Sequence, residues 1–177
     1  MGNIKKIQLK ELGEGLNYLT PSYGMVLAEA AAVCLDNQGH PNGVELLVDG
    51  DFSDKFHIYW PVVDQSMRRC YADLVEATEN GAYGIAILLA KDLAGFKIIE
   101  KSVRGNGFDY WLGFTDDFIF QNKTRLEVSG ILNGEERDIQ SRLRIKIGQT
   151  KKSDKLNIPA YIIIVEYGNP ISRIKIR

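Results

Sequence analysis

The sequence has few of the features that identify a class of protein directly. Its 177 residues include only two cysteines, Cys34 and Cys70, and their spacing is not that of a metal site. Both lie among apolar residues, so we expect buried free thiols. The N-terminus, MGNIKKIQLK, lacks the apolar run of a secretory signal. The longest uncharged apolar run, around residues 82–90, is far shorter than the roughly 20 residues that span a membrane. We therefore expect a cytoplasmic protein with no membrane partner.

A strong overall charge is also absent, because the formal net charge is −1. Composition therefore gives no global argument for nucleic-acid binding. Basic residues are nevertheless concentrated in residues 137–155, where they outnumber the acids Asp138 and Asp154. They are Arg137, Arg142, Arg144, Lys146, Lys151, Lys152 and Lys155. A nucleic-acid surface and an ordinary solvated helix face are both open for this segment.

The first 60 residues predict an N-terminal extension, and residues 61–177 predict a core. Residues 1–20 have weak periodicity and scattered glycines, so we expect an irregular arm. Residues 22–38 are rich in Ala and Leu, which favours a helix. Residues 43–60 contain two alternating runs around an Asp-Gly turn signal, which predicts a β-hairpin.

The periodicity of the core region predicts an α/β fold with a mixed sheet flanked by helices. A long helix is expected over residues 64–93, with Asp64 as its N-cap. The elements expected after it are strands at 96–103, 108–114 and 124–132, a helix at 135–152 and a strand at 160–167. The final residues, ISRIKIR, alternate and predict a further strand or a strand extension.

Two acids lie inside these apolar strands, Asp109 in GFDYWLG and Glu127 in RLEVSG. Strand side chains alternate between the two faces of a sheet, so Glu127 shares a face with Ser129 and lies opposite Leu126 and Val128. A buried acid is costly unless something neutralises it. Two acids on adjacent strands therefore suggest a shared cation. With Glu79 they would make three carboxylates, one of which should have a raised pKa without a cation. The alternative is a buried acid pair satisfied by arginines such as Arg104, Arg125 or Arg142.

The order helix–strand–strand–strand–helix–strand over residues 64–167 resembles the core of the PD-(D/E)xK nuclease superfamily, the restriction-endonuclease-like fold. The resemblance implies that Asp109 on the second strand, Glu127 on the third and Glu79 on the first helix hold Mg²⁺ or Mn²⁺. It also implies a lysine two residues after Glu127, where this sequence has Ser129 instead. A serine can donate one hydrogen bond but carries no charge. Lys146 on the second helix, or Lys97 or Lys101 on the first strand, could supply the missing lysine.

Two functions are consistent with this resemblance. The first is a metal-dependent nuclease with Asp109, Glu127, Ser129 and Lys146 as its catalytic residues. The nucleic-acid-binding residues expected with it are Arg142, Arg144, Lys146, Lys151 and Lys152. The alternative is a catalytically inactive relative that binds nucleic acid or protein, such as a component of a bacterial defence system.

The motifs GFDYWLG and LEVSG and the helix sequence ATENGAYGIAILL are also similar to a small bacterial family, and this similarity implies no activity. We further expect a homodimer, because Phe56, Ile58, Tyr59 and Trp60 give the N-terminal extension more apolar surface than a small appendage easily hides.

Overall fold

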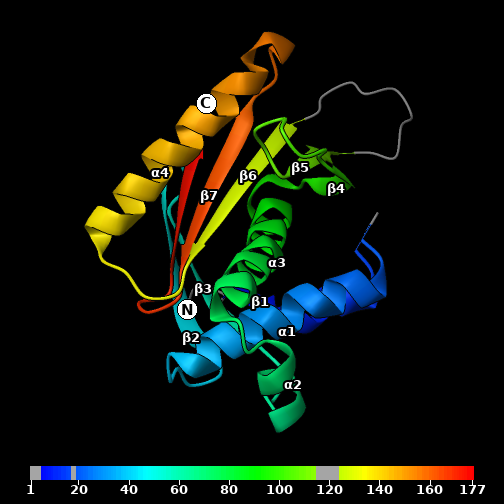
Figure 1. The fold of residues 1–177 in the computed structure, drawn as a ribbon, viewed down its shortest axis with the longest axis vertical. Helices are drawn as coiled ribbons and strands as arrows, with labels where there is room; N and C mark the ends of the chain where they lie inside the picture. Colours follow the sequence, from blue (N-terminus) through cyan, green and yellow to red (C-terminus); the bar gives the residue numbers. More distant parts are fainter. Residues whose placement is uncertain (1–4, 17–18, 115–123) are drawn as a thin grey trace.

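The computed structural model describes residues 5–16, 19–114 and 124–177, and it arranges them around one mixed sheet of eight strands (Figure 1). The strand order across the sheet is β1-β3-β2-β8-β7-β6-β5-β4. The strands are β1 Lys5–Gln8, β2 Val44–Gly50, β3 Asp54–Tyr59, β4 Lys97–Lys101, β5 Tyr110–Gly113, β6 Thr124–Ile131, β7 Ala160–Glu166 and β8 Ile171–Ile176. The helices are α1 Pro21–Asn37, α2 Gln65–Cys70, α3 Leu74–Ala94 and α4 Glu136–Thr150, with 3₁₀ turns η1 Leu9–Glu14 and η2 Lys151–Leu156.

The half of the sheet nearest β4 follows the predicted α/β order. Strands β4, β5 and β6 pair antiparallel in sequence order. Strand β7 then pairs parallel to β6, and α4 makes the crossover between them. The predicted mixed sheet and its flanking helices are confirmed, with strand ends at most two residues from the predicted bounds.

The half of the sheet nearest β1 comes mostly from the N-terminal extension. The predicted helix and the hairpin of β2 and β3 are confirmed. The irregular arm predicted for residues 1–20 is wrong where the structure describes it. There, β1 pairs parallel to β3, and Ile7, Leu9 and Leu12 are buried. Residues 1–4 and 17–18 of that arm lie outside the described residues. A four-residue strand whose partner is about fifty residues away has little local signal, and tertiary contact decides its conformation.

The long helix predicted over residues 64–93 is two helices, α2 and α3, with a break between Cys70 and Leu74. Asp64 is the N-cap of the first, as predicted, and accepts the backbone N–H of Met67. Asp73 caps the second by accepting the N–H groups of Val75 and Glu76. An aspartate in this position satisfies backbone donors best when a helix begins after it, which explains the break. Cys70 is exposed here, so only Cys34 is the buried thiol that the sequence predicts.

The helices cover both faces of the sheet. Helices α1 and α3 lie on one face, and α4 lies on the other (Figure 1). The first face carries the large core, to which Phe56, Ile58 and Trp60 contribute. These three side chains are buried within the chain, so they give the expected homodimer no exposed apolar surface. Among the described residues, no helix has both the length and the apolar character needed to cross a membrane.

The contact of α3 with its neighbours is very close. A Cβ atom on Gly81 would lie 2.7 Å from the Cα of Ala31 on α1. A Cβ atom on Gly130 of β6 would lie 2.3 Å from the carbonyl oxygen of Thr78 on α3. Both distances are shorter than real Cβ contacts, so glycine is required for helix α3 to pack at this depth.

Candidate functional site

Three polar residues of β6, at alternate positions, face helix α4. Two residues of a strand advance about 6.6 Å, and four residues of a helix advance about 6.0 Å, so the two repeats stay nearly in register. Helix α4 runs opposite to β6 and meets each strand residue with a polar group four positions earlier along the helix. We call these three contacts the β6–α4 ladder. Its rungs are Arg125 with Thr150, Glu127 with Lys146, and Ser129 with Arg142.

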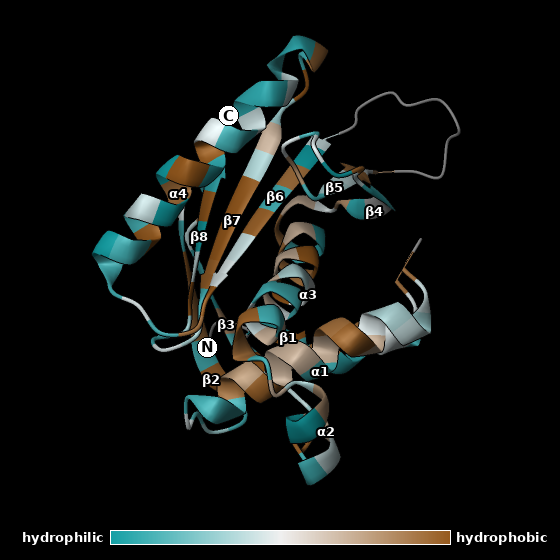
Figure 2. Cartoon of the chain, in the orientation of Figure 1, coloured by the Kyte–Doolittle hydropathy of each residue, from teal (hydrophilic) through white to brown (hydrophobic). Residues whose placement is uncertain are grey.

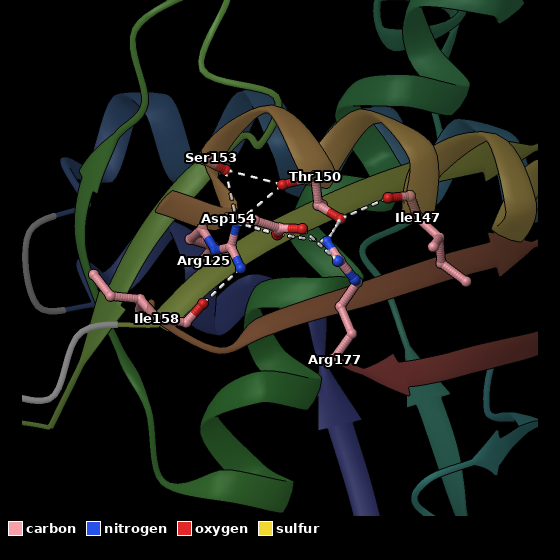
Figure 3. Close-up of polar contacts among 7 residues, drawn as sticks. All are labelled: Arg125, Ile147, Thr150, Ser153, Asp154, Ile158 and Arg177. Atoms are coloured by element: carbon pink, nitrogen blue, oxygen red, sulfur yellow. Dashed lines mark hydrogen bonds and ion pairs between the residues drawn. The ribbon is translucent and has the colours of Figure 1, made fainter. Parts of the chain in front are cut away.

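The first rung fixes the carboxyl end of α4 (Figure 3). Arg125 is buried, with 3% of its surface exposed. Its guanidinium donates to the carbonyl oxygen of Thr150 at 2.9 Å, to the hydroxyl of Ser153 at 2.7 Å and to the carbonyl oxygen of Ile158 at 2.6 Å. Nearby, Arg177 pairs with Asp154, which also accepts from Arg125. A cation bound to the last carbonyl of a helix is favourable because the helix dipole is negative there.

The middle rung carries the predicted acids. Glu127 Oε1 accepts from Lys146 Nζ at 2.6 Å. Asp109 lies directly before β5, and its Oδ2 accepts the backbone N–H of Val128 at 2.8 Å. The carboxyl groups of Asp109 and Glu127 are close enough for each to affect the pKa of the other. The structure therefore brings together three of the predicted site residues, Asp109, Glu127 and Lys146.

The ionisation of this acid pair is unusual. Burial and, after it, the neighbouring charge of Asp109 together raise the pKa of Glu127 to about 7, against the lowering effect of Lys146. Burial also raises the pKa of Asp109, although the Val128 N–H, Lys146 and the Tyr83 hydroxyl favour its charged form. A raised pKa means that the protein alone does not fully compensate two negative charges here. The sequence predicts this direction for one carboxylate of a group without a cation.

Glu79 reaches this pair only through another residue. The hydroxyl of Tyr83 lies 3.0 Å from Glu79 Oε1 and 3.1 Å from Asp109 Oδ1. Within the part of the chain that the structure describes, no group of three or more His, Cys, Asp or Glu side chains is close enough to hold a metal ion. Sequence reasoning missed Tyr83, although its position four residues after Glu79 places both side chains on one helix face.

Two hollows adjoin the acid pair. The main cleft, of about 470 Å³, lies between α3 and α4 and contains Asp109, Glu127, Lys146 and Lys152. The side groove, of about 360 Å³, shares Glu79 and Lys146 with it. The side groove is lined by Leu74, Val75, Thr78, Glu79, residues 128–132, Arg142 and Lys146.

The predicted nucleic-acid residues separate into two groups around these hollows. Lys146 and Lys152 line the main cleft, and Arg142 lines the side groove, whereas Arg144 and Lys151 line neither. Arg104 also lines the main cleft, and the sequence did not indicate it as a nucleic-acid contact.

The three candidate lysines have different positions. Lys101 lines the main cleft, but its amine lies 3.2 Å from the hydroxyl of Tyr23 and 5.5–5.9 Å from the ring centres of Tyr23, Tyr83 and Tyr110. Lys97 lines a separate hollow beside Phe96. Of these three lysines, Lys146 makes the hydrogen bond to an acid of the pair, so helix α4 supplies the cation that Ser129 does not.

The donor set suits Mg²⁺ or Mn²⁺. Mg²⁺ is commonly held by one or two carboxylates together with water and substrate phosphate. Asp109 and Glu127 supply two neighbouring carboxylates at the wall of an open cleft, and an ion could replace the proton that their raised pKa values favour. No protein-family model, curated protein or solved structure matches the chain.

Proposed function

We propose that the protein is a metal-dependent nuclease that hydrolyses phosphodiester bonds in nucleic acid, built on a restriction-endonuclease-like core. The observation that carries the proposal is the contact of Lys146 with Glu127, beside Asp109. It assembles two acids and a lysine in one cleft, although the lysine comes from α4 and not from β6. The order of the elements and the pairing of the strands also support the proposed core. The order is α3, β4, β5, β6, α4, β7.

Asp109 and Glu127 would hold Mg²⁺ or Mn²⁺, and Glu79 would approach it through water. The bound ion would polarise the phosphodiester and lower the pKa of a water molecule. Loading the site would displace the proton that Glu127 holds, because its pKa is raised to about 7.

The chain's own residues have distinct tasks in this proposal. Tyr83 and the N–H of Val128 orient the two oxygens of Asp109. Lys146 offsets the negative charge that develops on the reacting phosphate, as a fixed cation does at many such sites. Ser129 keeps no direct role in this arrangement, because its hydroxyl accepts from Arg142. Arg104 and Lys152 on the cleft wall bind neighbouring phosphates, which makes affinity fall as salt rises.

A cleavage assay with single- and double-stranded DNA and RNA tests the proposal. We expect Mg²⁺- or Mn²⁺-dependent cleavage, a loss of about 1,000-fold in Asp109→Asn and about 100-fold in Lys146→Met. Lys151→Ala is the matched control, since Lys151 belongs to the same basic segment but lines neither hollow. Absence of metal-dependent cleavage in the wild type, or equal cleavage by Asp109→Asn, contradicts the proposal.

A catalytically inactive relative is the second candidate, and one observation favours it. Protein donors already occupy both oxygens of Asp109 and one oxygen of Glu127. Calorimetric titration with Mn²⁺, read together with the cleavage assay, shows whether the acid pair binds metal at all. Saturable binding that Asp109→Asn abolishes, without cleavage, indicates a metal-binding relative, and absence of binding indicates a purely structural acid pair.

A further inference from the structure

The side groove differs in chemistry from the main cleft that it adjoins. Among the described residues, the main cleft is lined by equal numbers of acids and bases, four of each. The side groove is lined by two bases, Arg142 and Lys146, and one acid, Glu79. Most of its remaining wall is aliphatic, from Leu74, Val75, Val128, Ile131 and Leu132. Such a groove suits a ligand that has both a phosphate, which would bind the cations, and an uncharged ring, which would lie against the apolar wall.

Arg142 is available for such a ligand. Its guanidinium donates to the hydroxyl of Ser129 at 3.2 Å, a neutral acceptor that leaves the other donors of the fork free. Across the described ranges 5–16, 19–114 and 124–177, no carboxylate forms an ion pair with Arg142. An arginine fork matches the oxygens of a phosphate in two parallel hydrogen bonds.

The groove is also continuous with the acid pair. Lys146 and Glu79 belong to both hollows, so a chain lying across them would pass from one hollow to the other. The volume of about 360 Å³ falls within the roughly 300–1,000 Å³ of typical small-ligand sites and has room for one nucleotide.

We propose that the side groove holds one unpaired nucleotide of a single-stranded nucleic acid, with its phosphate on Arg142 and its base against the aliphatic wall. This inference rests on the proposed nuclease function and names its substrate class. A base that is paired and stacked in a duplex does not expose its ring to such a wall, whereas a base of a single strand does. The acid pair is recessed as well, because the side chain of Glu127 is only 4% exposed. A flexible single strand can bend into the cleft at that depth.

Binding without metal tests the inference independently of cleavage. The probes are fluorescently labelled DNA and RNA strands of about 15 nucleotides and their blunt duplexes, with anisotropy measured in EDTA. We expect at least about tenfold tighter binding of a single strand than of its duplex, and the DNA and RNA arms show which sugar is preferred. Arg142→Ala should weaken single-strand binding about tenfold, while Arg144→Ala, on the same helix but outside the groove, changes it less than about twofold.

A second pair of variants tests the aliphatic wall. Val75 is 81% exposed in the groove, and Val62 is 88% exposed outside it, so aspartate at either position should leave the fold intact. Val75→Asp should weaken single-strand binding about fivefold, through repulsion of the strand and loss of the apolar wall, and Val62→Asp should not.

Equal affinity for duplex and single strand, equal effects of the paired variants, or no oligonucleotide binding at all overturns the inference. Arg142-dependent binding without metal-dependent cleavage would leave it standing and overturn the nuclease proposal. Efficient cleavage of duplex alone would do the reverse.

Discussion

Helices α3 and α4 pack on opposite faces of the same strand, β6, and they do so with different chemistry. Helix α3 buries small and aliphatic residues along 77–90 and approaches the neighbouring backbone so closely that Gly81 and Gly130 have no room for a side chain. Helix α4 buries little besides Ile139 and Leu143 and is mostly polar (Figure 2). Its contact with the first half of β6 is the β6–α4 ladder.

The difference shows how one strand serves two purposes. The face of Leu126 and Val128 contributes apolar burial, which does not depend on direction and supplies stability. The opposite face holds Arg125, Glu127 and Ser129, whose hydrogen bonds are directional and fix the rotation of α4. The contact of Lys146 with Glu127 depends on that rotation, since a turn of the helix about its axis would separate the two side chains.

We expect the largest loss of stability from removal of the first rung of the β6–α4 ladder. Arg125→Met leaves the carbonyl oxygens of Thr150 and Ile158 and the hydroxyl of Ser153 without their donor. We expect the free energy of unfolding to fall by about 3 kcal/mol, because unsatisfied buried groups keep their full desolvation cost. Urea denaturation measures it, with Arg144→Met as the exposed control on the same helix. A loss equal to that of the control contradicts the structural role of Arg125.

A glycine-to-alanine change in each helix compares the space around α3 with the space around α4. In α3, Gly81→Ala places a Cβ atom against the backbone of Ala31, and we expect a loss of about 1–3 kcal/mol from overpacking. In α4, the same change at Gly148 meets nothing within 4 Å, and should stabilise the protein by about 0.5–1 kcal/mol through helix propensity. Thermal and urea unfolding check both. A stabilising effect of Gly81→Ala would contradict the close contact of α3 with α1, and a destabilising effect of Gly148→Ala would contradict the open space beside that residue.

Removing the lysine of the middle rung should change the acid pair more than the fold. Lys146 lowers the pKa of Glu127, which lies at about 7 with the lysine present. We expect Lys146→Met to raise that pKa further, because the only change to the local charge is the loss of a cation. Carboxyl ¹³C NMR titration measures it directly. Lys152→Met is the control, because Lys152 lines the same cleft. If the pKa of Glu127 rises as much in that variant, the effect comes from the total charge of the cleft and not from the contact of Lys146 with Glu127.

The smallest effect concerns the dependence of stability on pH. The pKa of Glu127 is raised from its ordinary 4.5 to about 7 in the folded protein, so the folded state holds a proton that the unfolded chain releases. Its contribution to stability is therefore full below about pH 4.5 and is lost as pH rises through about 7.

We expect the free energy of unfolding of the wild type, measured in urea, to fall relative to that of Glu127→Gln between about pH 5 and about pH 8. The expected fall is on the order of 1 kcal/mol. The glutamine variant serves as the reference because its side chain does not titrate. A constant difference across this range would contradict the raised pKa.

The sequence was sufficient for the elements from β4 to β7 and for the acid pair. Alternation alone places Glu127 with Ser129 and opposite Val128, because a strand has only two faces. The order of periodicities likewise predicts the strands near β4 to β7, since each has its own apolar run.

Long-range contacts were beyond the reach of local patterns. The sequence did not predict β1, because a four-residue strand acquires its conformation from β3. It named Lys146 only among several lysines, because the choice depends on the rotation of α4. The ladder that fixes this rotation joins residues up to 25 positions apart. The break before Asp73 lay within reach, since an aspartate before Leu74 is a strong N-cap signal.

The pairing of β2 with β8 has a consequence for the order in which the chain folds. These strands lie side by side, and Arg173 of β8 bonds Asp49 of β2, 124 positions away. During synthesis, the β2 edge of the hairpin of β2 and β3 therefore stays unpaired until β8 has left the ribosome. Long-range parallel pairing of this kind slows folding and leaves an edge open to other chains. A nascent chain stalled before β8 should thus depend on chaperones, whereas the finished protein should not.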